Sequence, residues 1–358
     1  MQAGERALPA VRHDFLPIAK PGNTVMTPIH EQVIDHPSAW TATSIGGKHN
    51  LMHQLESNQL QAIDALLQRT RHLRPQEVTR AHWDHPVVNA LLKDLREVIM
   101  NGRGIAIVSG VTPERNSEEE FQRIYWGFGT HLGVGAVQSA AGDRLGYVQN
   151  RDDDPVKRGY RSLRELHMHT DSYEAVGLMS VRAAKSGGLS GMASSLAIHN
   201  EFLKRRPDLL RPLYRGFRIA SEEARFSSKP VTDEAMPVFC SVAGKVSCMY
   251  EPSHMKNAAE LVPGGMPDDL AEALDYFDTL ANRDDLAMRF LLEPGEMMLW
   301  HNYTNLHSRT AFEDFPDRKR LLLRLWLTVP EGRPVDPAFR LRAQSYERIY
   351  REAVEKAH

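Results

Sequence analysis

Apolar residues recur at helical spacing in the first third of the chain. Residues 51–72 carry an apolar residue every three or four positions, which predicts a helix. A second helix is predicted over 86–100, where an Asn-Gly pair follows as a stop signal. Ser117, followed by three glutamates, predicts the N-cap and acidic first turn of a third helix. The apolar run 104–111 between them predicts a buried strand.

Beyond residue 140 the pattern changes to short apolar runs separated by turn residues. Many short strands of this kind predict a sandwich or barrel, here with helices on the outside. Helices interrupt the strands at about 194–206 and 268–282, and helical spacing returns from about Pro337. The predicted strands are RLGYVQN, HMHTDS, VGLMSVRA, FRIAS, VFCSV, KVSCMY, MRFLLE, MMLWHN and RLLLRLWLTV.

The sequence contains no internal repeat, low-complexity tract or flexible linker, so we expect a single domain over 1–358. Its expected parts are an irregular N-terminal arm (1–50), a helical extension with one strand (51–135), a β core (140–332) and a C-terminal helix (337–358).

Composition is that of an ordinary globular protein, with 42% hydrophobic residues and a formal net charge of −2. Such a charge offers no basic field for nucleic acid or an anionic membrane, so we expect neither as a partner. The N-terminus lacks a signal-peptide pattern, and no apolar run approaches the roughly 18 residues of a membrane span. We therefore expect a cytoplasmic protein that acts on a small molecule, and a homo-oligomer is compatible with the sequence.

The two cysteines, Cys240 and Cys248, flank a predicted hairpin turn at Ala243-Gly244. A two-residue loop would place Cys240 opposite Ser247, whereas a three-residue loop would pair the two cysteines. We expect two buried, reduced thiols, which fits a reducing compartment.

Residues 151–165 (RDDDPVKRGYRSLRE) are strongly polar. A solvated surface loop is the simpler interpretation. Their position just before an H-x-D motif also allows a lid over an active site.

The H-x-D motif is formed by His169 and Asp171 in a predicted strand, where residues two apart point the same way. Two histidines and one carboxylate leave three positions of an octahedral Fe(II) open. An H-x-D pair alone is a weak signal, because it arises by chance in many sequences. His167 would share the face of His169 in a regular strand, and it could act as a ligand, a substrate contact or a neighbouring group.

A later segment supplies a third ligand and two basic residues. It contains His301 and His307 and ends in a leucine-rich strand that carries Arg320 and Arg324. In that strand Arg320, Leu322, Arg324 and Trp326 fall on one face. Burying an arginine there is costly without an anionic partner. The strand is therefore either an edge strand with solvated arginines, or it aims both guanidinium groups into the core, where one binds a carboxylate bidentately.

The segments HTDS, SGGLSGMASS and LHSRTAFED…RKRLLLRLWL resemble the taurine dioxygenase and clavaminate synthase-like family of Fe(II)/2-oxoglutarate oxygenases. The resemblance covers roughly 104–330. It implies a mainly β fold with α decorations, namely a double-stranded β-helix (jelly-roll, cupin-like) core with flanking helices. It also implies that His169, Asp171 and His307 are the metal ligands and catalytic centre. His301 would be a structural or pocket-lining residue.

The same resemblance implies the cosubstrate contacts. Arg320 matches the arginine that holds the distal carboxylate of 2-oxoglutarate. Arg324 matches a second arginine that reaches the iron-side carboxylate or an acidic substrate group. Ser190 stands where many members carry a threonine that contacts the distal carboxylate.

The implied activity is oxidation of an unactivated C–H bond, most often hydroxylation, with Fe(II), 2-oxoglutarate and O2, and with release of succinate and CO2. Desaturation or cyclisation would use the same site, and the retained Asp171 argues against a halogenase. The mixed charge of 151–165 suggests a small polar substrate such as an amino acid or a derivative. Candidate substrate contacts are Tyr147, Gln149, His167, Tyr173, Arg309 and Arg324. A salt bridge to Glu313 or Asp314 is the alternative role for Arg309.

Two other classes fit parts of the pattern. A zinc-dependent hydrolase or lyase would use His167, His169 and His307 with an open fourth position. A non-catalytic barrel that binds a small ligand would need none of these histidines.

Overall fold

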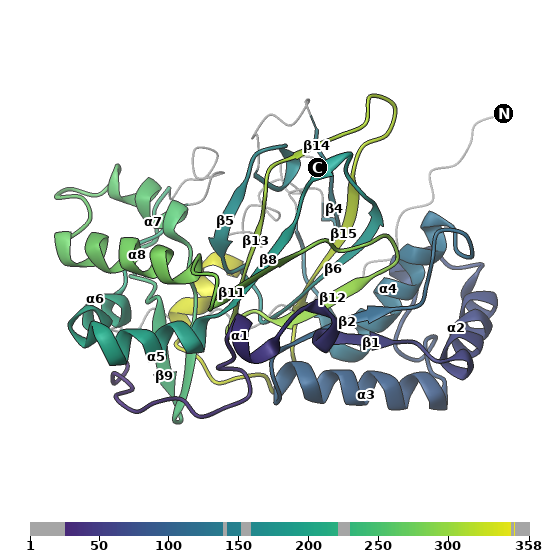
Figure 1. Ribbon diagram of the computed structural model, residues 1–358, viewed down its shortest axis with the longest axis horizontal. Helices are drawn as coiled ribbons and strands as arrows, with labels where there is room; N and C mark the ends of the chain where they lie inside the picture. The colour runs from purple at the N-terminus through teal and green to yellow at the C-terminus, as the bar shows by residue number, and fades with distance from the viewer. Residues whose placement is uncertain (1–25, 139–141, 152–158, 221–229, 345–346, 348–358) are drawn as a thin grey trace.

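The computed structural model describes residues 26–138, 142–151, 159–220, 230–344 and 347 (Figure 1). Its larger sheet is antiparallel except for the parallel β1–β2 pair. In spatial order its strands are β1 (Met52–Gln54), β2 (Ile105–Ser109), β12 (Met297–His301), β6 (Ala175–Arg182), β15 (Leu321–Thr328) and β3 (Val134–Gly135), and β4 (Leu145–Val148) also pairs with β15.

The smaller sheet lies against the larger one and is antiparallel throughout. Its strands, in order, are β11 (Ala287–Phe290), β8 (Ser190–Ser194), β13 (Asn305–Arg309) and β5 (Leu166–His169). Side chains from both sheets meet in one apolar cluster that includes Met192, Phe290, Val176, Trp300 and Trp326. The predicted β-rich core with flanking helices is therefore confirmed.

Helices cover the outer faces of the two sheets (Figure 1). Against the larger sheet pack α2 (Ser57–Thr70), α3 (Pro86–Met100) and α4 (Glu118–Leu132). Against the smaller sheet pack α5 (Ser195–Arg205), α6 (Leu210–Arg215), α8 (Asp268–Ala281) and the hairpin of β9 (Phe239–Val242) and β10 (Lys245–Cys248). The remaining elements are α1 (Ala42–Ile45), α7 (Pro252–Ala259), β7 (Ser186–Gly187), β14 (Phe312–Glu313), η1 (Lys48–Leu51), η2 (Pro75–Glu77), η3 (Gly159–Arg161), η4 (Pro207–Leu209) and η6 (Pro337–Arg340). Within the described ranges no helix has both the length and the apolar character that a membrane span requires.

Local signals located several helices well. α3 has the predicted bounds, and Ser117 caps α4 by accepting a hydrogen bond from the backbone of Glu120. The first predicted helix begins later than expected, at Ser57, because residues 52–54 pair with β2 as a strand. The predicted strand FRIAS is wrong, since Phe217 forms only an isolated bridge. The helices α6 and α7 were not predicted.

The two ends of the chain are only partly described. Residues 26–50 are irregular apart from α1 and the start of η1, as expected for the arm, while 1–25 lie outside the described residues. The predicted C-terminal helix begins as η6 and continues as helix over 341–344, and most of its remainder also lies outside them. The division of the chain into one domain stays a prediction.

The hairpin of β9 and β10 has the two-residue loop. Cys240 pairs with Ser247, and Ala243 and Gly244 adopt positive φ angles of 49° and 73°. Both cysteines are buried and free, which confirms the expected reduced thiols.

The two faces of β15 differ as the sequence predicted. The odd-numbered leucines, from Leu321 to Leu327, pack into the core shared with the helices of the larger sheet. Leu322, Arg324 and Trp326 line a cavity on the other side, and Arg320 joins them from the residue before the strand. The edge-strand alternative is wrong, because β15 is paired along both sides and both arginines are buried.

Candidate metal centre and its cavity

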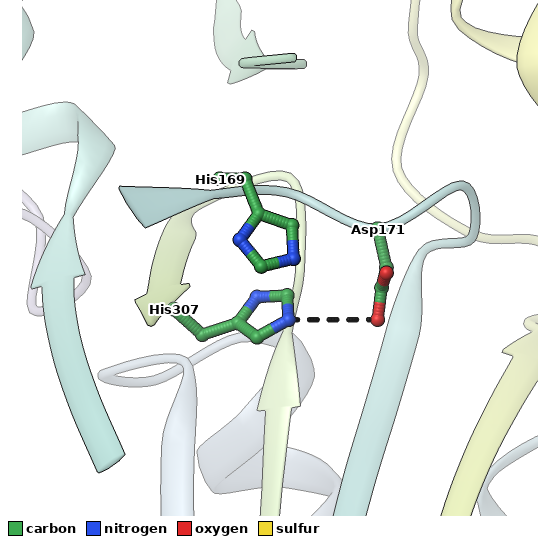
Figure 2. Close-up of side chains that lie close together, drawn as sticks. All are labelled: His169, Asp171 and His307. Carbon is green, nitrogen blue, oxygen red and sulfur yellow. Dashed lines mark ion pairs between the residues drawn. The ribbon is translucent and has the colours of Figure 1, made fainter. Parts of the chain in front are cut away.

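Two histidines and one aspartate converge between the strands of the smaller sheet (Figure 2). His169 is the last residue of β5 and pairs with His307 of β13, and Asp171 follows where the chain leaves β5. One ligand atom from each side chain lies within 4.8 Å of the other two. A single cation between them could contact all three.

One hydrogen bond and one close polar contact indicate which nitrogen of each imidazole faces this position. His169 Nδ1 lies 2.8 Å from the backbone oxygen of His167, which can only accept. Nδ1 therefore carries the proton, and Nε2 keeps its lone pair for a metal. His307 Nε2 lies 3.5 Å from Asp171 Oδ2, so His307 also presents Nε2 to the shared position.

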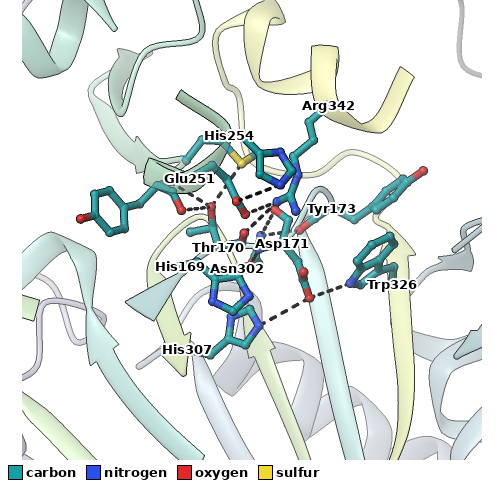
Figure 3. Close-up of polar contacts among 12 residues, drawn as sticks. His169, Thr170, Asp171, Tyr173, Glu251, His254, Asn302, His307, Trp326 and Arg342 are labelled. Atoms are coloured by element: carbon teal, nitrogen blue, oxygen red, sulfur yellow. Dashed lines mark hydrogen bonds and ion pairs between the residues drawn. The ribbon is translucent and has the colours of Figure 1, made fainter. Parts of the chain in front are cut away.

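Asp171 is held at both its carboxylate and its backbone (Figure 3). Its Oδ2 accepts a hydrogen bond from Trp326 Nε1 at 2.7 Å. Its backbone N–H donates to Asn302 Oδ1, and Asn302 Nδ2 donates back to the carbonyls of Asp171 and Tyr173 at 2.7 and 2.8 Å. Asn302 thus fixes the turn after β5, and Trp326 orients the oxygen that faces His307. Such supporting contacts typically strengthen a metal site.

The protonation states of the three groups suit a divalent cation. Burial lowers the pKa of His169, and burial together with His169 lowers that of His307 to about 3. Burial would raise the pKa of Asp171, but the nearby Arg324 and the two histidines outweigh it and hold that pKa well below its usual range. The set is thus two neutral imidazoles and one carboxylate, so a metal need not displace protons to bind.

A cavity of about 880 Å³ opens beside the three side chains, and Arg324 is one of the residues that line it. The Arg324 guanidinium lies over the rings of Trp326 and Tyr160, at 4.0 and 4.5 Å from their centroids. Its Nε donates to Gln138 Oε1 at 2.9 Å. The cation is therefore held in place by stacking and one hydrogen bond.

One end of the cavity, which we call the arginine end, is formed by Arg309, Arg320 and Ser190. Both guanidinium groups lie over the ring of Phe312, at 4.7 and 5.0 Å from its centroid. Within the described part of the chain neither has an ion pair, so the alternative that Arg309 pairs with Glu313 or Asp314 is not observed. The turn at Gly187-Gly188 lies against this end: Gly188 has φ +70°, and a Cβ there would lie 3.1 Å from Arg320 Nε.

The opposite end of the cavity, which we call the paired end, contains Glu251, His254 and Arg342 (Figure 3). Arg342 Nη1 donates to Glu251 Oε1 and, at 2.9 Å, to the carbonyl of Thr170, which lies between two of the candidate ligands. His254 Nε2 lies 3.9 Å from Glu251 Oε2. The buried charges at this end largely neutralise one another.

The family model described as taurine catabolism dioxygenase TauD, TfdA family matches residues 69–326. The chain belongs to this family. A curated relative, FR-33289 synthase of Streptomyces rubellomurinus (strain ATCC 31215), is 32% identical over 248 residues, which are 66% of this chain and 72% of that protein. The predicted enzyme class, a dioxygenase, is confirmed.

Solved structures of other oxygenases share the fold of this TauD-family chain. Asparagine oxygenase in complex with Fe(II), 2S,3S-3-hydroxyasparagine and succinate has a TM-score of 0.62 and 16% identity, over 78% of this chain and 94% of that one. The non-heme iron oxygenase OrfP in complex with Fe, succinate and (3S)-hydroxy-L-Arg has a TM-score of 0.58 and 14% identity, over 80% and 98%.

The structure does not bring every candidate substrate residue of this TauD-family protein to the cavity. Arg309 and the exposed His167 line it. Tyr147 and Gln149 instead border a second hollow of about 330 Å³, and the Tyr147 hydroxyl donates to Gln122. Tyr173 is buried in the apolar cluster between the sheets, and it packs on Trp326.

His301 is also buried away from the cavity, with Nε2 3.5 Å from Glu174 Oε1, so it is structural. His167 is not part of the metal cluster, which removes the third ligand of the zinc alternative.

Cavity residues that the sequence analysis did not single out include Gln138, Tyr160, Glu251, His254 and Arg342. Tyr160 lies in the polar segment 151–165 and Arg342 in the predicted C-terminal helix, but no motif marked either side chain as part of a site. A glycine in β4, Gly146, is the one local feature that could have indicated the position of Gln138. Gly146 lies opposite Arg324 on β4, and a Cβ there would come within 2.5 Å of Gln138 Oε1. The glycine therefore makes room for the amide that binds Arg324.

Proposed function

We propose that this TauD-family enzyme binds Fe(II) through His169, Asp171 and His307, and that it uses 2-oxoglutarate and O2 to hydroxylate an unactivated C–H bond of a small polar molecule. The observation that carries the proposal is the approach of the three ligand atoms to within 4.8 Å of one another. Two neutral nitrogens and one anionic oxygen are the donor set that leaves open positions on Fe(II). Bound together, Fe(II), 2-oxoglutarate and O2 supply the oxidising chemistry, with succinate and CO2 as co-products.

The chain's own task is binding, orientation and exclusion of water. In this proposal Arg320 and Ser190 bind the distal carboxylate of 2-oxoglutarate at the arginine end. Arg324, held by Gln138, binds an acidic group nearer the metal. Trp326 and Asn302 keep Asp171 in the orientation that the metal requires.

We infer that the substrate is an amino acid or a derivative of one. The cavity offers both signs of charge to a zwitterion, because Arg324 lies near the metal position and the exposed carboxylates of Asp275 and Asp278 line the same cavity. The solved relatives whose names include hydroxyasparagine and hydroxyarginine support this inference for substrate class. The cytoplasmic location and a homo-oligomeric state stay predictions from the sequence.

The direct test adds Fe(II) and then 2-oxoglutarate to the protein without O2. We expect the weak visible charge-transfer band of the metal chelate, and we expect His169→Ala to abolish it. Arg318→Gln, a change of an exposed arginine outside the cavity, should leave the band unchanged. With O2, succinate release across amino acids, sulfonates and fatty acids then identifies the substrate class. Absence of the band from folded, unsubstituted protein would refute the cofactor assignment, and activity confined to substrates other than zwitterions would refute the substrate assignment.

A further inference from the structure

Arg309 and Arg320 are both buried, with 5% of each residue exposed. Nε and Nη1 of Arg309 and Nη1 of Arg320 have no hydrogen-bond partner among the residues that the structure describes. A buried charged donor without a partner is costly, so such groups are normally found where a ligand supplies the acceptor.

The arginine end has one more positive charge than negative charges. Burial and the neighbouring Arg309 lower the pKa of Arg320 to about 9, which indicates that the two cations repel each other. One carboxylate, Asp314, lies near both, and it accepts a hydrogen bond from the backbone of Arg320 at 2.7 Å. Two cations and one carboxylate leave a net charge of about +1, which a single additional carboxylate would neutralise.

Arg309 also holds a piece of the cavity wall. Its Nη2 donates to the carbonyls of Ser162, at 2.9 Å, and of Arg164. Phe312, the ring beneath both guanidinium groups, donates its backbone N–H to the carbonyl of Leu163 at 3.1 Å. These carbonyls belong to residues 159–165, which we call the covering segment because they line the cavity.

We propose that Arg309 binds the distal carboxylate of 2-oxoglutarate together with Arg320, and that the same guanidinium fastens the covering segment over the bound cosubstrate. This inference rests on the proposed function. It gives Arg309 a cosubstrate contact in place of a substrate contact. An added carboxylate removes the repulsion between the two cations and so favours the position of Arg309 in which Nη2 holds the carbonyls of residues 162 and 164.

The covering segment also reaches the part of the cavity where the substrate would bind. The covering segment carries Tyr160, whose ring lies over Arg324 near the metal position. Cosubstrate binding at the arginine end therefore also fixes one aromatic wall of the substrate's part of the cavity.

The test compares two 2-oxo acids that differ only in the relevant group. Dissociation constants of 2-oxoglutarate and of 2-oxobutyrate, which lacks the distal carboxylate, are measured without O2 from the charge-transfer band of the Fe(II) protein. Loss of a charged hydrogen bond corresponds to about tenfold to hundredfold weaker binding. We expect Arg309→Gln to weaken the binding of 2-oxoglutarate by that factor. The dissociation constant of 2-oxobutyrate should change less than about twofold. Arg318→Gln, which removes an exposed arginine that lies over Phe315, should change neither.

Hydrogen exchange tests the second half of the inference. In the unsubstituted protein 2-oxoglutarate should protect the amides of residues 159–165, whereas 2-oxobutyrate should not. Arg309→Lys keeps the charge but cannot reach the carboxylate and both carbonyls, so it should keep part of the affinity and lose the protection.

Binding of 2-oxobutyrate by Arg309→Gln doubles as the check that this variant is folded. Equal weakening of both 2-oxo acids, or unchanged binding of 2-oxoglutarate, would overturn the role of Arg309 while leaving the proposed function intact. Absence of any band from the unsubstituted protein overturns both.

Discussion

The two ends of the active-site cavity treat buried charge in opposite ways. At the arginine end, Arg309 and Arg320 are buried without an ion pair among the described residues. At the paired end, Arg342 is equally buried but contacts Glu251 directly. A folded chain tolerates uncompensated buried charge only at a cost, which a ligand can remove. We infer that the arginine end binds an anionic ligand, whereas the positive charge at the paired end is already compensated by a carboxylate of the protein.

The paired end also supports the loop that carries two of the candidate ligands. Arg342 comes from residues beyond the 69–326 that match the family model, and it binds the carbonyl of Thr170 between His169 and Asp171. A C-terminal residue thus supports the loop that carries two candidate ligands. We infer that folding depends more on the paired end, and cosubstrate binding more on the arginine end.

The largest expected effect comes from breaking the buried pair. Glu251→Gln removes the carboxylate that contacts the buried Arg342 guanidinium, and we expect the free energy of unfolding to fall by about 3–5 kcal/mol. Denaturant titration of the metal-free protein measures this value. The matched control is Glu272→Gln, which removes an exposed partner of Arg206 and should cost less than about 1 kcal/mol. Equal losses in the two variants would show that the paired end contributes no more to folding than a surface pair.

Adding an anion that binds at the arginine end should raise the stability of the protein. Succinate, which keeps a carboxylate at the correct end of the molecule, should stabilise the metal-free protein by about 2.7 kcal/mol at a concentration 100 times its dissociation constant. Thermal unfolding with increasing succinate measures the gain. Arg320→Gln should remove most of this gain. Glu251→Gln should show the same gain, starting from a lower stability without succinate. A gain that survives Arg320→Gln would place the anion elsewhere.

Alternation along one strand made much of the site predictable. In β15 the period of two separated the leucine face from the face of Arg324 and Trp326, and both assignments hold in the structure. The same reasoning failed for Tyr147 and Gln149, because the register of β4 was unknown. Val148 lies opposite Leu322, so Val148 faces the cavity and its neighbours face away.

The residues that the sequence did not reveal act through partners far along the chain. Gln138 contacts Arg324 across 186 positions, and Arg342 contacts Glu251 across 91. No local period or motif encodes such pairs, because they depend on how separate segments pack. The end of α3 at Asn101 and the N-cap of α4 at Ser117 were predictable for the opposite reason, since these residues are adjacent in sequence to their helices.

The smallest expected effect lies where the two ends meet, at Asp171. Trp326→Phe keeps an aromatic ring beneath Arg324 but removes the N–H that donates to Asp171 Oδ2 at 2.7 Å. Loss of a supporting contact of this kind typically weakens metal binding by about tenfold to hundredfold. Anaerobic titration with Fe(II) or Co(II) measures the change.

Trp300→Phe is the matched control for this experiment. Trp300 lies 4.9 Å from His307 between ring centroids, yet its Nε1 has no hydrogen-bond partner among the described residues. Removing that N–H therefore takes no support from the ligands, and the variant should keep most of its metal affinity. If the two tryptophan variants lose metal affinity equally, ring packing and not the hydrogen bond to Asp171 controls the site. In that case the Asp171 carboxylate would be positioned by the packing of the neighbouring rings. Neither end of the cavity positions its charged groups in that way.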